Sequence, residues 1–220
     1  MSSLSGNLGE HGNAGASIAI VDDDERVLEA LSFQLRTAGF STSCHSSAES
    51  LLEHLGAKEY DCVVADICLP KLNGLQLLSR IKLTRAFLSV IFITGHGDMA
   101  MGVQAMREGA IDCFEKPVAE VDLLGAIERA IGLTRAKRAE YLRRRDLNQR
   151  RKALTPRERE VFALITAGLL NKQVGAELGP SEGTVKKHRA RLMRKMGADS
   201  LADLVRMAEI LKIDQDQRAE

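Results

Sequence analysis

The chain has 220 residues, of which 45% are hydrophobic and 28% are charged. A typical domain has ~100–200 residues, so this length favours two domains. Residues 1 to 134 carry 10 Lys and Arg against 18 Asp and Glu, whereas residues 135 to 220 carry 21 against 12, so the net charge of +1 hides an acidic half and a basic half. A basic half favours a polyanionic partner, with nucleic acid ahead of a membrane surface.

The cysteines and the start of the chain exclude several classes of protein. Cys44, Cys62, Cys68 and Cys113 show no Cys-x-x-Cys spacing and no clustered histidine, which argues against a zinc site or a disulfide framework and favours reduced thiols. Residues 1–16 are rich in Ser, Gly and Asn and lack the basic and apolar parts of a signal peptide. No apolar run approaches the ~18 residues of a membrane span. We therefore expect a soluble cytoplasmic protein with no membrane partner and a disordered segment at residues 1–16.

From residue 17 the sequence alternates short apolar runs with segments of helical periodicity. Continuous Val and Ile runs are typical of strands buried on both faces, and helices of about ten residues between them favour right-handed crossovers. We therefore predict an α/β fold over residues 17–134, with a doubly wound parallel sheet of (βα)5 type. The expected strands are residues 17–22, 40–46, 62–67, 89–94 and 112–116, and the expected helices are residues 25–39, 48–55, 74–83, 99–109 and 121–132.

Polar side chains stand where the predicted strands end. Asp22 and Asp23 follow the first strand, Asp66 ends the third, Thr94 the fourth and Lys116 the fifth. Since sites in such sheets lie beyond the carboxyl ends of the strands, we expect these side chains to converge. Three crowded carboxylates favour a bound Mg²⁺. With the metal present, Asp66 can attack phosphorus as a nucleophile, while Thr94 and Lys116 hold the transferred oxygens.

Each of these residues also has a plainer interpretation. The acidic run at residues 22–24 can begin a helix, and we expect Asp24 to be its N-cap. Thr94 can form a local hydrogen bond at a strand end, and Lys116 can be a solvated cation. Only their joint position at successive strand ends favours a phosphoryl site.

The stretches VDDD, DICLPKLNG, TGHGD and EKP resemble the receiver domain of bacterial two-component response regulators, and TGHGD with AMREGAIDCFEKP is similar to the FixJ-type group. The resemblance covers about residues 17–134. It implies that a cognate histidine kinase phosphorylates Asp66, and that Thr94 and Lys116 contact the phosphoryl group. It also implies a cis Lys116–Pro117 bond and no enzyme activity beyond the domain's own phosphoryl transfer and dephosphorylation. The implied Mg²⁺ ligands are Asp22, Asp23, Asp66 and the backbone carbonyl of Cys68.

Two residues depart from the family pattern. Family members usually carry Tyr or Phe where this chain has Cys113, so the expected switch residues, Thr94 and Cys113, cannot couple through rotation of a ring. Cys68 is smaller than the residues common at its position and could be a reactive thiol, although the sequence pairs no cysteine clearly with a cationic activator. Phosphatases of the haloacid dehalogenase type also use a strand-end Asp, but they need a second Asp where Cys68 stands, which disfavours that enzyme class.

The basic half begins with residues 135–153, whose composition favours a solvated linker helix. Extra phosphate contacts or a dimer-forming coiled segment are the alternatives for this stretch. Thr155, Pro156 and Glu158 have the spacing of a capping box. A compact helical domain is therefore expected at residues 154–213, followed by a tail at residues 214–220.

Residues 171–196 have the pattern of a helix-turn-helix. We expect a helix at residues 171–178, a turn at Gly179 and Pro180, and a second helix that is capped by Ser181 and ends near residue 196. On the second helix the apolar side chains that would face the core are Val185, Leu192 and Met196, and the cations that would face elsewhere are Lys186, Lys187, Arg189, Arg191 and Arg194.

The stretches LTPREREVFALITAGLLNKQVGAEL, TVKKHRARLMRKMG and SLADLVRMAEIL resemble the LuxR-type (NarL/FixJ) DNA-binding domain over about residues 151–213. The resemblance implies that Lys186 and Lys187 contact bases. Lys187 stands where an apolar residue is common and can bond guanine. Pro180 and Gly183 also depart from the usual residues, which loosens the turn and the start of the helix. The other DNA contacts that it implies are Asn171, Lys172, Ser181, Thr184, His188 and Arg191.

Together these patterns predict a transcription factor that is activated by phosphorylation of Asp66, forms a homodimer, and binds promoter DNA at half-sites ~10 bp apart. The resemblance places the dimer contact on residues 99–107 and the strand that contains Cys113, and it implies RNA polymerase as a further partner. One alternative is a constitutive DNA-binding regulator whose receiver-like half is a degenerate dimerisation or ligand-sensing module. The other is an RNA-binding protein, which the narrow groove of A-form RNA disfavours.

Overall fold

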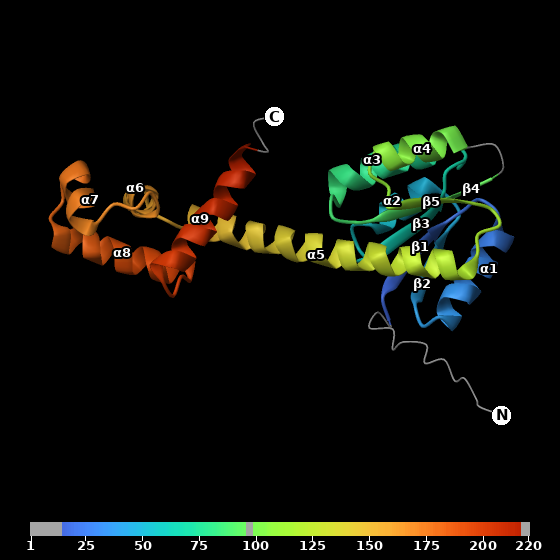
Figure 1. The fold of residues 1–220 in the computed structure, drawn as a ribbon, viewed down its shortest axis with the longest axis horizontal. Helices are drawn as coiled ribbons and strands as arrows, with labels where there is room; N and C mark the ends of the chain where they lie inside the picture. Colours follow the sequence, from blue (N-terminus) through green and yellow to red (C-terminus); the bar gives the residue numbers. More distant parts are fainter. Residues whose placement is uncertain (1–14, 96–98, 217–220) are drawn as a thin grey trace, which may run out of the picture. The chain divides into compact units, whose positions relative to one another are not determined.

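A computed structural model describes residues 15–95 and 99–216 of the chain. These residues form two compact units, which divide between Arg138 and Ala139 (Figure 1). The first unit is a sheet covered by helices, and the described residues of the second unit form helices and connecting loops. Residues 1–14, within the predicted N-terminal segment, and residues 217–220, within the predicted tail, lie outside the described part.

The sheet of the first unit has the predicted parallel topology. Its strands are β1 (Ser17–Val21), β2 (Ser41–His45), β3 (Cys62–Asp66), β4 (Val90–Thr94) and β5 (Asp112–Glu115). They lie in the order β2-β1-β3-β4-β5, and all neighbouring pairs are parallel. This arrangement confirms the doubly wound α/β fold and brings the carboxyl ends of β1, β3, β4 and β5 to one edge.

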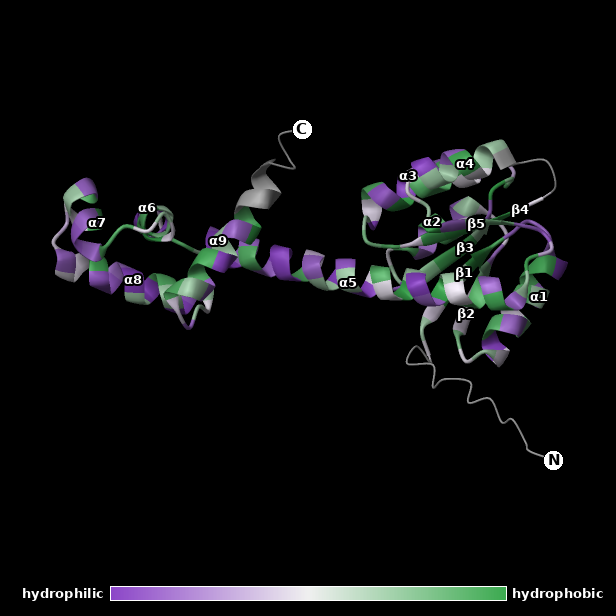
Figure 2. Ribbon diagram, in the orientation of Figure 1, coloured by the Kyte–Doolittle hydropathy of each residue, from purple (hydrophilic) through white to green (hydrophobic). Residues whose placement is uncertain are grey.

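Two hydrophobic cores lie on the two faces of the sheet. Along β1, Ala19 and Val21 face one core and Ile18 and Ile20 face the other, because side chains alternate along a strand. The first core is covered by α2 (Ala48–His54), α3 (Gly74–Thr84) and α4 (Met99–Arg107), and the second by α1 (Glu25–Thr37) and the first part of α5 (Glu120–Lys152). Figure 2 shows the strands as the most hydrophobic layer of this unit.

Helix α5 continues beyond the residue 132 at which the sequence pattern ends the fifth helix, and it includes most of the predicted linker helix. Residues 133–152 contain no Gly or Pro, so nothing in the chain interrupts the helix. The buried Thr134 hydroxyl accepts a hydrogen bond from the Ser89 amide at 3.0 Å, and Arg135 and Arg138 each lie 3.5 Å from the Asp61 carboxylate. These contacts hold the helix on the sheet unit as far as residue 138.

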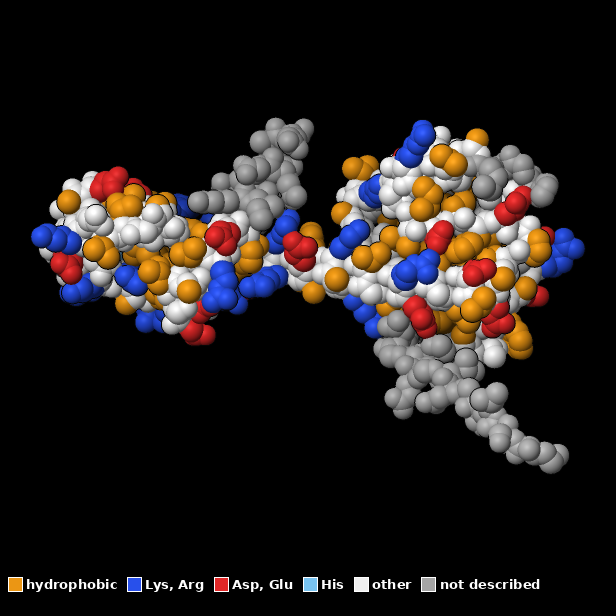
Figure 3. Space-filling view, in the orientation of Figure 1, with side chains coloured by type: hydrophobic (Ala, Val, Ile, Leu, Met, Phe, Trp, Pro, Cys, Tyr) orange, Lys and Arg blue, Asp and Glu red, His pale blue; other side chains and the backbone are white. Residues whose placement is uncertain are grey.

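The second unit surrounds its own core with the end of α5 and four further helices. These are α6 (Pro156–Thr166), α7 (Asn171–Leu178), α8 (Glu182–Met196) and α9 (Leu201–Asp216), the last of which includes residues 214–216 of the predicted tail. Figure 3 shows Lys and Arg side chains on the visible face of this unit, interspersed with hydrophobic and acidic ones. The buried core includes Leu147, Leu154, Val161, Ile165, Val174, Val185, Leu192, Met196, Leu204 and Leu211.

The predicted capping box at the start of α6 is confirmed. The Thr155 amide donates to the Glu158 carboxylate at 2.9 Å, and the Glu158 amide donates to the Thr155 hydroxyl at 3.3 Å. The buried Glu158 side chain also accepts from the Lys195 ammonium at 2.6 Å. Burial alone would raise the pKa of Glu158, but the hydrogen bonds from Lys195 and Thr155 outweigh burial and hold that pKa below its usual value.

We expect Glu158→Gln to lower the free energy of unfolding of the helical unit by about 1–3 kcal/mol at pH 7, because Lys195 loses a charged acceptor. The pKa of Glu158 is lower in the folded than in the unfolded chain, so this difference should shrink as the pH falls below the usual glutamate pKa of about 4.3. Hydrogen–deuterium exchange at the α6 and α8 amides of the full chain measures it.

The matched control is Glu160→Gln on the same helix. The Glu160 side chain is 51% exposed and pairs with Arg157 at 2.7 Å, so its loss should cost less than about 0.5 kcal/mol. Equal destabilisation in the two variants would contradict a special role for the Glu158–Lys195 pair.

Candidate functional site

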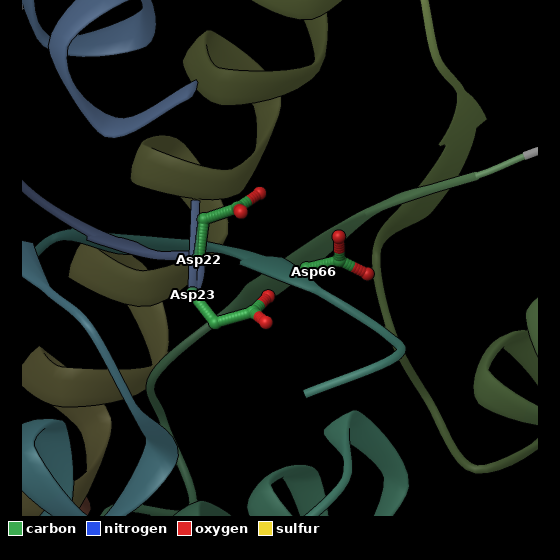
Figure 4. Close-up of side chains that lie close together, drawn as sticks. All are labelled: Asp22, Asp23 and Asp66. Atoms are coloured by element: carbon green, nitrogen blue, oxygen red, sulfur yellow. The ribbon is translucent and has the colours of Figure 1, made fainter. Parts of the chain in front are cut away.

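The three predicted aspartates meet at the carboxyl edge of the sheet. Asp22 and Asp23 follow β1, and Asp66 is the last residue of β3. One carboxylate oxygen from each lies within 4.8 Å of the others, and Figure 4 shows the three side chains directed toward a shared space. Asp22 is buried, Asp66 is half-buried and Asp23 is exposed, so the cluster opens to solvent on one side.

Lys116 joins two of these carboxylates. Its ammonium donates to Asp22 Oδ2 at 2.7 Å and to Asp66 Oδ2 at 2.6 Å. Burial lowers the pKa of Lys116, but the hydrogen bonds and charges of Asp22 and Asp66 outweigh it and raise that pKa above its usual value. The Lys116–Pro117 bond is cis, as the family resemblance implies. A charged ammonium therefore offsets part of the repulsion between the two acids.

Backbone amides orient the remaining carboxylate oxygens. Asp66 Oδ1 accepts from the Cys68 amide at 2.8 Å, and Asp22 Oδ1 accepts from the Asp24 amide at 3.0 Å. Asp24 itself caps α1 through the Arg26 amide at 2.9 Å, which confirms its predicted role. Asp23 forms no ion pair within the described part of the chain, so its carboxylate is available to a ligand.

Close packing fixes the loop behind Asp66. A Cβ at Gly74 would lie 2.8 Å from Ile67 Cα and 3.2 Å from the Asp66 carbonyl oxygen, so only glycine allows the start of α3 to approach the end of β3 this closely. The Gly74 amide donates to the Ile67 carbonyl at 2.9 Å. The backbone next to Asp66 is thereby held before any ligand arrives.

Thr94 lies at the end of β4, beside β3 and next to the strand that leads to Lys116. Its side chain is fully buried, and its hydroxyl has no hydrogen-bond partner among the described residues. A buried hydroxyl without a partner costs free energy, so such a group at the edge of a charged site indicates a ligand oxygen. Residues 96–98 of the TGHGD stretch lie outside the described residues.

The donor set fits a magnesium ion. Three carboxylates supply hard oxygen atoms, and the exposed side of the cluster leaves room for the waters that Mg²⁺ retains. Asp22, Asp23 and Asp66 would hold the ion.

Cys113 lies half-buried in β5 against α4. A Cβ at Gly102 of α4 would lie 2.9 Å from the Cys113 sulfur, so the small thiol and the glycine allow close approach of helix and strand. Burial, with the charge of Asp112, raises the pKa of the Cys113 thiol. The thiol is therefore a packing group rather than a reactive thiolate. Cys68 is exposed.

The second candidate site is the helix-turn-helix of α7 and α8, whose bounds match the predicted ones closely. Ser181 caps α8 through the Thr184 amide at 3.3 Å, and Gly179 ends α7 with a φ of 91°. Asn171 and His188 are half-buried, and the exposed members of the predicted DNA-contacting set are Lys172, Ser181, Thr184, Lys186, Lys187 and Arg191. The core-facing set of Val185, Leu192 and Met196 is confirmed.

One contact in this motif was missed from the sequence. Arg189 donates to the side-chain oxygen of Asn171 at 3.3 Å and so ties the start of α7 to α8. Lys186 pairs with Glu182 at 3.1 Å on the exposed surface, whereas Lys187 forms no ion pair with the described residues. A contact between residues 18 positions apart leaves no periodic signal that sequence analysis could detect.

The fold and the two sites define a regulator with an acidic cluster at the carboxyl edge of a parallel sheet and a helix-turn-helix. Residues 18–128 match the family described as response regulator receiver domain, and residues 152–208 match the family described as bacterial regulatory proteins, luxR family. The chain belongs to the two-component response regulators that carry a LuxR-type DNA-binding domain.

Among its relatives is response regulator protein TodT of Pseudomonas putida strain F1, which is 42% identical over 195 residues that cover 89% of this chain and 86% of TodT. Transcriptional regulatory protein FixJ of Rhizobium meliloti strain 1021 is 40% identical over 192 residues, 87% of this chain and 94% of FixJ. The solved structure of response regulator StyR matches 89% of this chain and 99% of its own, with 38% identity and a TM-score of 0.78.

Full-length FixJ from B. japonicum matches 90% of this chain and 98% of its own, with 36% identity and a TM-score of 0.55. No helix in the described ranges combines the length and hydropathy needed to cross a bilayer.

Proposed function

We propose that Asp66 accepts a phosphoryl group from a histidine kinase and that this modification controls binding of the helical unit to promoter DNA in the cytoplasm. The observation that carries the proposal is the convergence of Asp22, Asp23, Asp66 and Lys116 beside the Thr94 hydroxyl, which has no hydrogen-bond partner among the described residues. A cluster of ion pairs with a purely structural role would not need a buried hydroxyl that lacks a described partner at the same edge of the sheet.

Phosphoryl transfer requires little of the protein beyond positioning of the reacting groups and stabilisation of charge. A carboxylate oxygen of Asp66 attacks phosphorus, the bond between phosphorus and the kinase histidine nitrogen breaks, and the imidazole leaves with a proton from solvent. The Cys68 amide and Lys116 hold the attacking carboxylate in place. Mg²⁺, when bound, would supply positive charge to the phosphoryl oxygens.

After transfer, the aspartyl phosphate brings new negative oxygens to the sheet edge. Lys116 can move from its two carboxylates to a phosphoryl oxygen, and the Thr94 hydroxyl can donate to another. Hydrolysis at the same phosphorus atom would reverse the modification. We propose no other enzymatic activity.

Dimerisation is proposed on the face formed by α4 and β5. Val103 and Met106 of α4 are 50% and 43% exposed, an apolar pair that a second copy could cover. The dimer would place two α8 helices in successive major grooves, with RNA polymerase as the downstream partner.

For DNA affinity, we expect Lys172→Ala to weaken binding to all duplexes alike and to reduce the slope of log K against log salt by about 1, because the variant loses one phosphate contact. Fluorescence anisotropy at several salt concentrations measures the slope. Arg206→Ala, which removes an exposed cation that is paired with Asp203 at 3.1 Å, is the control and should leave the slope unchanged. An unchanged slope in Lys172→Ala would remove that residue from the interface.

A constitutive DNA-binding regulator is the second candidate, and it is favoured by one feature. Cys113 replaces the ring that relatives of the receiver family use, so the sheet unit could be a dimerisation module that no longer switches. Magnesium-dependent labelling at Asp66 together with a phosphodonor-dependent gain in operator affinity distinguishes the two, because the constitutive protein would bind operator equally well without the donor.

A further inference from the structure

The helical unit contains a cavity that neither proposed site uses. It has a volume of about 650 Å³ and lies between the end of α5, helix α6 and helix α9. Ligand cavities in proteins usually measure about 300–1,000 Å³, so this volume suits a small molecule. The lining residues are Arg151, Lys152, Arg159, Phe162, Ala163, Thr166, Ala208 and Leu211.

The inner wall of the cavity is apolar. Phe162, Ala208 and Leu211 belong to the core of the unit and are 9%, 5% and 2% exposed. The Thr166 hydroxyl already donates to the Phe162 carbonyl at 2.8 Å, so its proton is not free for a ligand. The inner wall therefore favours a hydrocarbon or aromatic surface over a polar one.

The charged lining residues are three cations. No Asp or Glu among the described residues lines the cavity, and none of Arg151, Lys152 and Arg159 forms an ion pair with those residues. By contrast, six other cations of this unit each pair with an Asp or Glu, namely Arg144, Arg150, Arg157, Lys186, Lys195 and Arg206. Three cations without an ion pair to the described residues thus stand together beside the apolar wall.

Helix stability does not account for all three cations. Arg151 and Lys152 lie in the last turn of α5, where positive charge is favourable, but Arg159 lies near the amino end of α6, where the helix dipole disfavours it. Arg159 therefore stands at a position that costs free energy unless an anion is near.

We propose that this cavity binds an organic anion with an apolar body, such as an aromatic carboxylate. The apolar body contacts Phe162, Ala208 and Leu211, and the carboxylate is bound by Arg151, Lys152 and Arg159. A DNA phosphate carries a negative charge that the three cations could bind, but it has no apolar body to contact Phe162, Ala208 and Leu211. No residue of α8, the proposed recognition helix, lines the cavity. Binding would stabilise the packing of α6 and α9 by mass action.

The experiment titrates the full chain with naphthalene-2-carboxylate and follows both probe fluorescence and hydrogen exchange. Naphthalene-2-methanol, which has the same rings and no charge, is the matched probe. We expect saturable one-to-one binding of the carboxylate, slower exchange at α6 and α9 amides, and much weaker binding of the alcohol.

Two variants test separately how much the cations and the apolar wall contribute to binding. Arg151→Gln with Arg159→Gln should weaken carboxylate binding by about tenfold or more and leave the alcohol unaffected, because only the charged interactions are lost. Ala163→Phe should prevent binding of both probes by filling the cavity. The matched control, Arg157→Gln with Arg206→Gln, removes the same charge from paired cations outside the cavity and should change neither affinity.

Three outcomes would overturn the proposal. The alcohol could bind as tightly as the carboxylate, the paired-cation control could weaken binding as much as the cavity variant, or Ala163→Phe could bind normally. If the cavity variant loses duplex DNA affinity and keeps its affinity for naphthalene-2-carboxylate, the cations belong to a DNA interface instead.

Discussion

Asp66→Asn should abolish covalent labelling by acetyl phosphate, because an amide oxygen is too weak a nucleophile to attack phosphorus. The change preserves the size of the side chain and its hydrogen bond from the Cys68 amide. Lys116 keeps its bond to Asp22 at 2.7 Å, so we expect the sheet unit to remain folded. Intact-protein mass spectrometry, with and without Mg²⁺, measures the added phosphoryl group.

Glu29→Gln is the matched control for this change. Glu29 is an exposed carboxylate on α1, so its loss alters the net charge of the sheet unit by the same amount without touching the cluster. We expect full labelling in this variant. Undiminished labelling of Asp66→Asn would assign the acceptor to another residue and would remove the basis of the proposed switch.

Lys186→Ala combined with Lys187→Ala should erase the preference for operator over unrelated duplex DNA, while weak binding to both is retained. Specific sites commonly exceed unrelated DNA by a factor of about 10³ or more, and each lost base contact costs about 1–3 kcal/mol. Both side chains are exposed near the start of α8, and Lys187 has no competing ion pair within the described part of the chain. An operator selected from random duplexes and a competition assay supply the measurement.

Arg194→Ala is the control, because Arg194 lies two turns beyond Lys187 on the same helix and is exposed in the same way. Its loss should lower affinity for all sequences slightly and leave the preference intact. If the double variant keeps its preference, the bases must be contacted by other residues of the motif.

The sequence allowed the sheet and its acidic site to be predicted because both depend on short-range patterns. Runs such as residues 62–66 mark a buried strand, and the rule that parallel strands present their carboxyl ends at one edge then brings Asp22, Asp66 and Lys116 together. The capping box of Thr155 and Glu158 was predicted for the same reason, since three residues contain the whole signal.

Contacts between distant residues were not predictable in this way. The capping box does not indicate that Lys195, 37 positions away, donates a hydrogen bond to Glu158. Likewise, the helical pattern that ends at residue 132 does not indicate that Thr134 accepts a hydrogen bond from the Ser89 amide. That the Thr94 hydroxyl has no partner in the described part of the chain likewise follows from the folded neighbourhood, because a sequence does not show which polar groups surround a side chain.

The close approach of α4 and β5 couples the space available to residues 102 and 113. Because a Cβ at Gly102 would lie 2.9 Å from the Cys113 sulfur, a larger side chain at position 102 needs a smaller one at position 113. The reverse exchange is not possible, since glycine has no side-chain atom to lose. A bulky ring at position 113 therefore requires α4 to move outward.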